Sequence, residues 1–518
     1  MTMTTEEQTL ITGPKVGITI AAMAAALMAV LDISIVNVAL SDIRASFGTP
    51  LDQIAWVSTG YMMANVVVIP MTGWLQRRFG YKRYFTASIL MFTAASALCG
   101  LAWNLPSLVL FRMLQGLGGG AIIPTAQSIL FARYPRKEHG TAGALFGLGA
   151  ITGPLLGPTV GGYLIDLFSW HWIFLINVPI GLFAAWFAYR NIEEPGYERP
   201  DEPIDTYGIA LLAVGMGSLQ YVLEEGNRND WFQSFEIVVL TAVAVVSLVT
   251  FVVRQLETRY PVVDLRIFKN VAYSAATGIN FLVGVALFSA TYLFSLFCGA
   301  VVHYSAKDIG HVFLVAGLVQ IVCMPLVGRF GHKVDGRALL FLGVLVVAFS
   351  LYLTTQYTRS VGFWDLTRPR MVLGAGLSLI FIPLSILALS DLDPKLRGNA
   401  TGLFNLTREL GGSIGTAWMG MLVTDGTRVH AAHLAEHVTP YDPNTQQQVA
   451  LLTHTVGAGT VDPTRTAHAI LQLRVVNESM VRAFTDAFAM VSAVIACSAL
   501  LVFLLRKPDG PVEIAGAH

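Results

Sequence analysis

The sequence predicts an all-α protein that crosses a membrane about fourteen times, and three observations carry that prediction. Of the 518 residues, 54% are hydrophobic and only 13% are charged, whereas soluble domains carry roughly 25% charged residues. The mean hydropathy is +0.62. Long apolar runs follow one another along the chain, separated by short polar segments. The chain therefore has too little polar surface to coat a water-soluble particle.

Each apolar run has the length of a membrane span. A hydrocarbon core about 30 Å thick takes about 20 helical residues, and helices satisfy the backbone hydrogen bonds that lipid cannot. The expected spans are 16–40, 53–74, 84–102, 106–130, 140–165, 172–190, 205–223, 235–254, 272–298, 308–328, 338–356, 369–389, 398–423 and 483–505. The first run is too long for a signal peptide and is interpreted as an uncleaved span. The pair at 205–223 and 235–254 is the least distinct, and without it the count is twelve.

Positive charges set the expected orientation. Placing the N-terminus in the cytoplasm puts most Lys and Arg residues in cytoplasmic loops, and an even number of spans returns the C-terminus there. The expected organisation is a cytoplasmic tail at 1–15, a six-helix bundle at 16–190, a linker with two extra spans at 191–271, a second six-helix bundle at 272–505 and a cytoplasmic tail at 506–518. Basic and acidic residues balance at 33 each, so no nucleic-acid partner is expected.

One connection is much longer than the others. The polar stretch 425–481 lies on the outer side in this topology, and a loop of this length is usually functional or disordered. We expect either a docking element or a flexible cover. Within it, His430 and His433 could share one helical face, but they have no acidic or cysteine companion at a ligand spacing, so no metal site is expected. The four cysteines stand singly and are interpreted as packing residues.

The first of three glycine-rich motifs follows the second span, where Gly73 and Gly80 bracket Arg77 and Arg78. Glycine permits a tight turn, and the arginines hold the loop on the cytoplasmic side. A fainter copy at 328–333 indicates that the chain is built from two similar halves.

The other two motifs lie inside spans. In the fourth span, the segment 108–120 places Arg112 about seven residues into the membrane, where an arginine costs roughly 2.5–3.5 kcal/mol and therefore needs a cavity or a partner. The third motif, in the fifth span, contains Gly149, Gly153, Pro154, Gly157 and Pro158. Glycines four residues apart make a flat face for close helix contact, and prolines bend a helix. Such a face suits a hinge between two rocking halves.

In this order and these positions, the motifs resemble those of the major facilitator superfamily, and the third is similar to the motif of its antiporters. Segments 31–40 and 170–181 resemble the fourteen-span drug:proton antiporter family. Segments 227–232 and 404–415, together with the long outer loop, resemble the EmrB-type multidrug exporters. The resemblance covers nearly the whole chain. Arg77 is a departure, because the superfamily's first motif has an acid at that position.

The resemblance implies both a fold and an activity. The implied fold is two six-helix bundles with two inserted spans. The implied activity is the export of hydrophobic or amphiphilic toxic compounds by proton antiport and alternating access, with no cofactor apart from protons as the coupling ion. The implied location is the bacterial inner membrane, where EmrB-type exporters work with an EmrA-like periplasmic adaptor and an outer-membrane channel.

Few ionisable residues lie deep within the expected spans, and they are the candidate coupling residues. Asp32 and Arg112 lie at similar depth, roughly 10–12 Å below the outer face. In the family's arrangement their two spans both line the central cavity. Asp32 is interpreted as a proton-carrying carboxylate influenced by Arg112, and the alternative is a static ion pair that packs helices. Glu409 is a second proton site, a counter-charge for cationic substrates or a structural residue.

Other polar residues are candidates for the cavity wall. The candidate residues are Asn37, Tyr61, Gln115 and Arg408, with helix packing as the alternative for each. Because Arg408 and Glu409 point about 100° apart, one is expected to face the cavity and the other a neighbouring helix. Glu224 and Glu225 are expected to form a solvated helix end.

Two rival functions remain open at this stage: a proton-coupled solute symporter, and a membrane sensor that keeps the fold without transport. An enzyme is not expected, since the sequence has no phosphate-binding loop, no HExxH motif and no clustered catalytic set.

Overall fold

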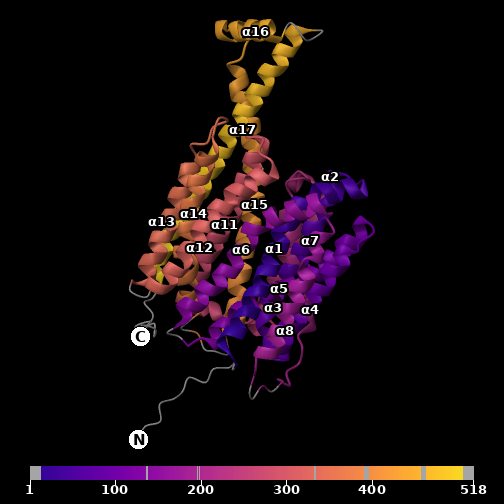
Figure 1. The fold of residues 1–518 in the computed structure, drawn as a ribbon, viewed down its shortest axis with the longest axis vertical. Coiled ribbons are helices and arrows are strands. Elements are labelled where there is room, and N and C mark those ends of the chain that lie inside the picture. Colours follow the sequence, from indigo (N-terminus) through magenta and orange to yellow (C-terminus); the bar gives the residue numbers. More distant parts are fainter. Residues whose placement is uncertain are drawn as a thin grey trace.

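The computed structural model describes residues 13–135, 138–194, 197, 199–331, 334–389, 392, 396–456 and 462–505. The expected tail at 506–518 and most of the tail at 1–15 lie outside this set, as do Lys333 of the second motif copy and its neighbour His332. Nearly all described residues are helical. The helices before residue 192 form one bundle, and those after residue 270 form a second bundle beside it (Figure 1).

The first bundle, called the N-terminal half, is built from six long helices and two short ones. They are α1 (Lys15–Phe47), α2 (Leu51–Ile54), α3 (Trp56–Phe79), α4 (Tyr81–Gly100), α5 (Leu105–Arg133), α6 (His139–Leu167), α7 (Trp172–Leu175) and α8 (Asn177–Asn191). Helix α1 packs on α5, α6 and α8, and α3 packs on α5. The end of the molecule where α1 begins is called the terminal end, and the opposite end is called the far end.

The second bundle, called the C-terminal half, repeats this plan with longer final helices. Its elements are α11 (Val271–Ala300), α12 (Ala306–Phe330), α13 (Gly336–Thr354), α14 (Phe363–Leu389), α15 (Arg397–Glu436), α16 (Pro443–Val456), α17 (Pro463–Ser498) and the 3₁₀ helix η5 (Ala499–Leu504). Between the halves in sequence come α9 (Thr206–Glu225), η2 (Trp231–Gln233), α10 (Phe235–Glu257) and η3 (Leu265–Lys269).

Every one of the fourteen expected spans falls on a helix. Among the described residues, ten helices are both long and apolar enough to cross a membrane, which makes the chain a multi-pass membrane protein. The remaining expected spans lie on α3, α4, α6 and α15. Helix α15 carries Arg408 and Glu409 within the expected span 398–423, and these charges lower the apolarity of the span. The count of fourteen stays a prediction.

The local sequence explains where several helices begin. Helix α5 starts with a capping box, in which the Asn104 side chain accepts from the Ser107 N–H and the Ser107 hydroxyl accepts from the Asn104 N–H. Between α3 and α4 the chain turns at Gly80, whose φ of 81° favours glycine. The Glu194 carboxylate then accepts from the backbone N–H groups of Tyr81 and Lys82, at 2.7 and 2.9 Å.

The inserted helix α9 packs on α10 and also lies against both halves. On the N-terminal half, the Trp56 and Tyr221 rings lie 5.4 Å apart. On the C-terminal half, Gln220 Nε2 donates to Ser413 Oγ at 3.1 Å. Glu225 is buried and forms an ion pair with Arg228 at 2.9 Å, so the expectation of a solvated end was wrong for this residue. Helix α9 therefore bridges the halves near the far end.

The long polar stretch 425–481 is largely helical. Helix α15 has 40 residues, about 60 Å at 1.5 Å per residue, which is twice a membrane span, and α17 has 36 residues. Their extensions form a stalk at the far end, and α16 lies across its tip (Figure 1). His430 Nε2 lies 2.7 Å from Asp486 Oδ2 between the two stalk helices. This contact between His430 and Asp486 links the two stalk helices, α15 and α17.

Candidate transport site

A buried ion pair lies at the centre of the N-terminal half. Asp32 on α1 and Arg112 on α5 are joined by a contact of 2.6 Å between Oδ2 and Nη1, with side-chain exposures of 0% and 2%. The other carboxylate oxygen, Oδ1, accepts from Gln115 Nε2 and from Asn177 Nδ2, both at 2.8 Å. The carboxylate therefore has three donors from two other helices, which offsets the cost of burying its charge.

Arg112 is held as tightly as its partner. Its Nε donates to the Val57 carbonyl at 3.0 Å, and its Nη1 also donates to Gln115 Oε1 at 2.8 Å. The guanidinium lies over the Tyr61 ring, 4.3 Å from the centroid, and near the Phe174 ring at 5.7 Å. Aromatic faces attract cations more strongly when water is excluded. Arg112 is therefore held by contacts from three neighbouring helices, α1, α3 and α7.

The structure brings together four of the residues chosen from sequence: Asp32, Arg112, Gln115 and Tyr61. It does not bring Asn37 to them, because Asn37 is exposed on α1. Five residues along a helix correspond to a rotation of about 140°, so Asn37 points away from the Asp32 side. Sequence reasoning missed Asn177 as a site residue, although it lay in the segment 170–181 that carried the family resemblance.

A second polar cluster lines a small cavity between the halves. The cavity is about 30 Å³, and its wall includes Asn65, Asn405, Arg408 and Glu409. Both Arg408 and Glu409 line it, contrary to the expectation that only one would. Helices of both halves form the wall of the cavity. The side of α15 that faces the cavity is wide enough for two adjacent side chains to reach it. Arg408 Nη2 donates to Asn405 Oδ1 at 2.7 Å.

Polar side chains connect the two clusters and the two halves. Asn65 Nδ2 donates to the Tyr61 hydroxyl at 3.2 Å, so Tyr61 touches Arg112 on one side and a cavity residue on the other. Across the halves, Asn405 Nδ2 donates to Gln127 Oε1 at 2.7 Å. A continuous row of polar groups therefore runs from Asp32 to the cavity that contains Glu409.

The C-terminal half contains a buried arginine that sequence reasoning did not single out. Arg370 on α14 is 4% exposed, lies 4.0 Å from the Phe294 ring centroid and donates to the Ala290 carbonyl on α11. The signal was present, because Arg370-Met-Val-Leu-Gly-Ala-Gly repeats Arg112-Met-Leu-Gln-Gly-Leu-Gly. The expected span began at residue 369, which placed Arg370 at the membrane edge, whereas α14 begins at Phe363.

The glycines of the third motif pack against α1. A Cβ at Gly153 would lie 2.7 Å from the Leu31 backbone nitrogen, and one at Gly149 would lie 3.3 Å from the Met23 carbonyl. Gly157 likewise meets Ser34. This face therefore packs within the N-terminal half, next to Asp32, and its role as a hinge stays a prediction. Helix α6 runs unbroken across Pro154 and Pro158, whose side chains lie outside what the structure describes.

The first motif does lie at the junction of the halves. A Cβ at Gly73 would collide with the backbone of Asn399 at the start of α15. Arg78 Nη1 donates to the carbonyls of Pro200 and Glu202, at 2.6 and 3.0 Å, and the Arg77 carbonyl accepts from the Tyr197 hydroxyl at 3.2 Å. The motif thus packs against the C-terminal half through Gly73. Its two arginines are hydrogen-bonded to the segment before α9. The halves are closed against each other at the terminal end.

Comparison with known proteins agrees with this architecture. The Major Facilitator Superfamily profile matches residues 22–416. The multidrug export protein EmrB of Haemophilus influenzae is 37% identical over 84% of this chain and 85% of its own length. EmrB of Escherichia coli is 34% identical over 95% of both chains. The fatty acid resistance protein FarB of Neisseria gonorrhoeae is 36% identical over 83% of this chain and 84% of its own.

Solved structures show the same fold. The human organic anion transporter MFSD10 superposes with a TM-score of 0.61 at 12% identity, covering 95% of this chain and 100% of its own. The proton:xylose symporter XylE superposes with a TM-score of 0.62 at 13% identity, covering 96% and 98%. The closed pair of helical bundles, the buried charges and the sequence matches lead to one conclusion: the chain belongs to the major facilitator superfamily.

Proposed function

We propose that this chain is a secondary active transporter that exports several hydrophobic or amphiphilic compounds in exchange for protons. Two relatives at 34–37% identity over most of the chain are multidrug export proteins by name, which supports the export of multiple compounds. The observation that supports proton coupling is the buried Asp32, Arg112, Gln115 and Asn177 network. Its only carboxylate is the group that can gain and lose a proton there.

The proposed coupling step is electrostatic. The charged Asp32 carboxylate holds α1 to α5 and α8 through its three donors. A proton on Asp32 removes the negative charge, so the attraction to Arg112 falls to that of a neutral hydrogen bond. Arg112 is then free to act on Tyr61 and, through Asn65, on the cavity between the halves. Glu409 in that cavity is the proposed second site, as a proton carrier or as the counter-charge for cationic substrates.

The cavity beside Glu409 is too small for a drug in this conformation. A cavity of about 30 Å³ holds roughly one water molecule, whereas drug-sized ligands occupy about 300–1,000 Å³. Opening therefore requires one end of the halves to separate. The tight contact at Gly73 is at the terminal end, so alternating access includes breaking and remaking this contact.

Reconstitution tests the proposal. The purified full chain is placed in lipid vesicles with an imposed pH gradient and a fluorescent cationic dye. We expect dye to move against its own gradient as protons run the other way. Asp32→Asn, which keeps the shape, should move no more dye than protein-free vesicles. Asp42→Asn, an exposed acid on the same helix, should behave like the unmodified protein.

Other outcomes of the same assay would overturn the proposal. Uphill dye movement by Asp32→Asn would show that this carboxylate is not the proton carrier. Movement of dye in the same direction as protons would indicate a symporter. Tight dye binding without any movement in the unmodified protein would indicate a sensor. Dye binding by Asp32→Asn, measured by fluorescence polarisation, controls for correct folding.

We also propose that the protein lies in the bacterial inner membrane, with both termini in the cytoplasm, and that the stalk contacts a periplasmic adaptor of a tripartite system. The tip exposes apolar side chains, including Tyr441 at 90% and Leu451 at 58%. Replacing 437–462 with a short Gly-Ser linker should abolish drug resistance in cells and leave vesicle transport intact. Retained resistance would rule out docking by this tip.

A further inference from the structure

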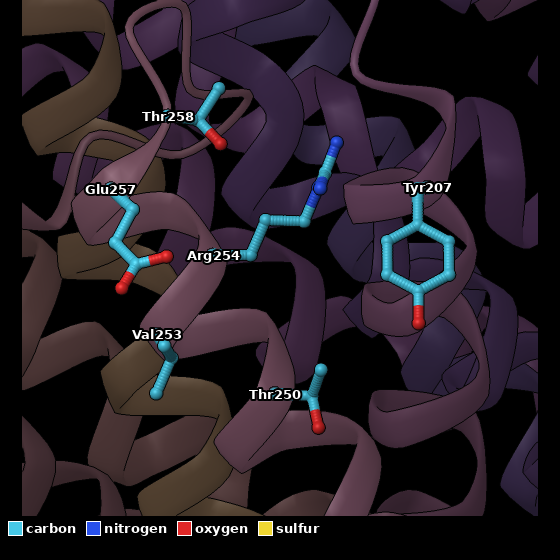
Figure 2. Close-up of a pocket in the computed structure, with 6 residues that line it drawn as sticks. All are labelled: Tyr207, Thr250, Val253, Arg254, Glu257 and Thr258. Atoms are coloured by element: carbon cyan, nitrogen blue, oxygen red, sulfur yellow. The ribbon is translucent and has the colours of Figure 1, made fainter.

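A charged groove lies on the inserted helices, away from the proposed transport route. It is formed where α9 begins and α10 ends and has a volume of about 360 Å³. Its lining residues are Tyr207, Thr250, Val253, Arg254, Glu257 and Thr258. Figure 2 shows Arg254 between Tyr207 on one side and Glu257 on the other. The segment before α9 is tied to Arg78 at the end of α3, so the groove lies toward the terminal end.

Among the residues that the structure describes, the guanidinium of Arg254 is hydrogen-bonded along one edge only. Its Nε and Nη2 contact Asp205 Oδ1 at 2.8 and 2.7 Å, which leaves Nη1 available to a ligand. Asp205 also accepts from the Gly208 N–H and from Gln255 Nε2, both at 2.9 Å, so its carboxylate is held in place. The side chain of Arg254 is 39% exposed, and its guanidinium lies 5.0 Å from the Tyr207 ring centroid.

A charge of opposite sign lies next to this cation. Glu257 is exposed and stands three residues after Arg254, so both side chains lie on one side of the helix. Arg254 is paired with Asp205, and among the described residues Glu257 is in no salt bridge. The groove thus offers a cation and an anion at neighbouring points, with threonine hydroxyls beside them.

The groove leads onto an apolar surface. Helix α10 exposes a run of valines, namely Val245, Val246, Val249, Val252 and Val253. Val253 belongs both to this run and to the groove wall. In a membrane helix, an exposed aliphatic face meets lipid chains. A ligand of the groove therefore needs a head with both charges and a long apolar tail.

We propose that this groove binds a phospholipid whose headgroup carries a phosphate and a primary ammonium. The phosphate contacts Arg254 and the hydroxyl of Thr258. The ammonium contacts Glu257, and the acyl chains follow the valine run. A headgroup with only negative charge is disfavoured because it meets Glu257. A trimethylated ammonium is disfavoured because it has no N–H groups to donate.

Native mass spectrometry of the delipidated full chain tests this site. The protein is titrated with equal amounts of phosphatidylethanolamine and phosphatidylglycerol, and bound lipids are counted by class. Glu257→Gln should lower the ratio of ethanolamine to glycerol lipid by about two- to five-fold, the range of a partly exposed ion pair. Glu257→Lys should lower it further. Both changes are at an exposed residue, so folding should be retained.

A matched control and four contrary outcomes complete the test. Glu236→Gln, at the other end of α10 where Glu236 accepts from the Tyr221 hydroxyl, should leave the lipid ratio unchanged. An unchanged ratio in Glu257→Gln, or an equal fall in Glu236→Gln, overturns the site. Competition by soluble glycerophosphoethanolamine as strong as that by the lipid would show a soluble ligand instead. Displacement of lipid by a cationic dye would show an entry site for substrate.

Discussion

Arg112 and Arg370 occupy matching places in the two halves, on the fourth long helix of each. Arg112 lies over Tyr61 and near Phe174, and Arg370 lies over Phe294 at 4.0 Å. The difference is in the partner. Arg112 meets the Asp32 carboxylate on α1, whereas Arg370 donates to the Ala290 carbonyl on α11. Within the described part of the chain, Arg370 has no salt-bridge partner.

The two halves differ in whether the buried arginine is paired with a carboxylate. Leu373 stands at the place of Gln115 in the repeated motif, so the amide that supports the carboxylate is also missing from the C-terminal half. The buried Arg370 Nε has no hydrogen-bond partner among the described residues. Both halves thus bury an arginine at the matching place. Arg112 in the N-terminal half is paired with a titratable carboxylate, and Arg370 in the C-terminal half is hydrogen-bonded to a backbone carbonyl. Of the two buried arginines, only Arg112 is therefore expected to take part in proton coupling.

The largest expected difference is in stability. Arg112→Met leaves the Asp32 charge buried without its counter-charge and should lower the free energy of unfolding by about 3–5 kcal/mol. Arg370→Met removes a buried charge that has no such partner and should be close to neutral or stabilising. Denaturant unfolding in detergent, followed by tryptophan fluorescence, measures both. An equal fall in the free energy of unfolding of the two variants would show that the two arginines stabilise the fold to the same extent.

A smaller contrast separates two asparagines in the N-terminal half. Asn177→Ala removes a donor to a buried carboxylate and should cost about 1.5–3 kcal/mol, the range for hydrogen bonds to charged groups. Asn37 is exposed on α1, and Asn37→Ala should stay within about 0.5 kcal/mol of the unmodified protein. The same unfolding assay decides between them. A large effect at Asn37 would mean that its surroundings differ from this closed state.

The smallest effects test close helix packing, which both halves share. Gly153→Ala forces a Cβ against the Leu31 backbone, and Gly411→Ala forces one against the Phe281 carbonyl. Each should cost about 1–3 kcal/mol by overpacking, and Gly162→Ala, where no atom lies within 4 Å, is the control.

Transport then sharpens the contrast between the halves. Gly153→Ala should reduce gradient-driven dye movement more than downhill movement, because its neighbour α1 carries the Asp32 carboxylate that pairs with Arg112. A similar selective loss in Gly411→Ala would place coupling in both halves.

The positions of the helices and the Asp32–Arg112 pair could be predicted from the sequence. A membrane span fixes the depth of each residue. Two opposite charges at the same depth are expected to pair, because an unpaired charge inside the membrane is costly. The rotation of a helix about its axis is not fixed in this way. For that reason Asn177 was missed, Asn37 was grouped with Asp32 although it points away from it, and the shared cavity of Arg408 and Glu409 was not foreseen. These outcomes depend on packing between segments that are distant in sequence.

The stalk shows a second limit. Its composition is polar, and polarity predicts exposure to water but does not separate a loop from a helix whose hydrogen bonds are all internal. The expectation for 425–481 left order and disorder open, whereas α15 and α17 continue as helices and support each other through His430 and Asp486.

Helix α15 is one uninterrupted element from Arg397 to Glu436. It begins beside Gly73, passes the cavity at Arg408 and Glu409, and ends at the tip of the stalk. Over its length of about 60 Å, a tilt of about 5° at the base displaces the tip by roughly 5 Å. If the terminal end opens as proposed, this single rigid helix would turn a small tilt at its base into a larger displacement of whatever surface the tip contacts.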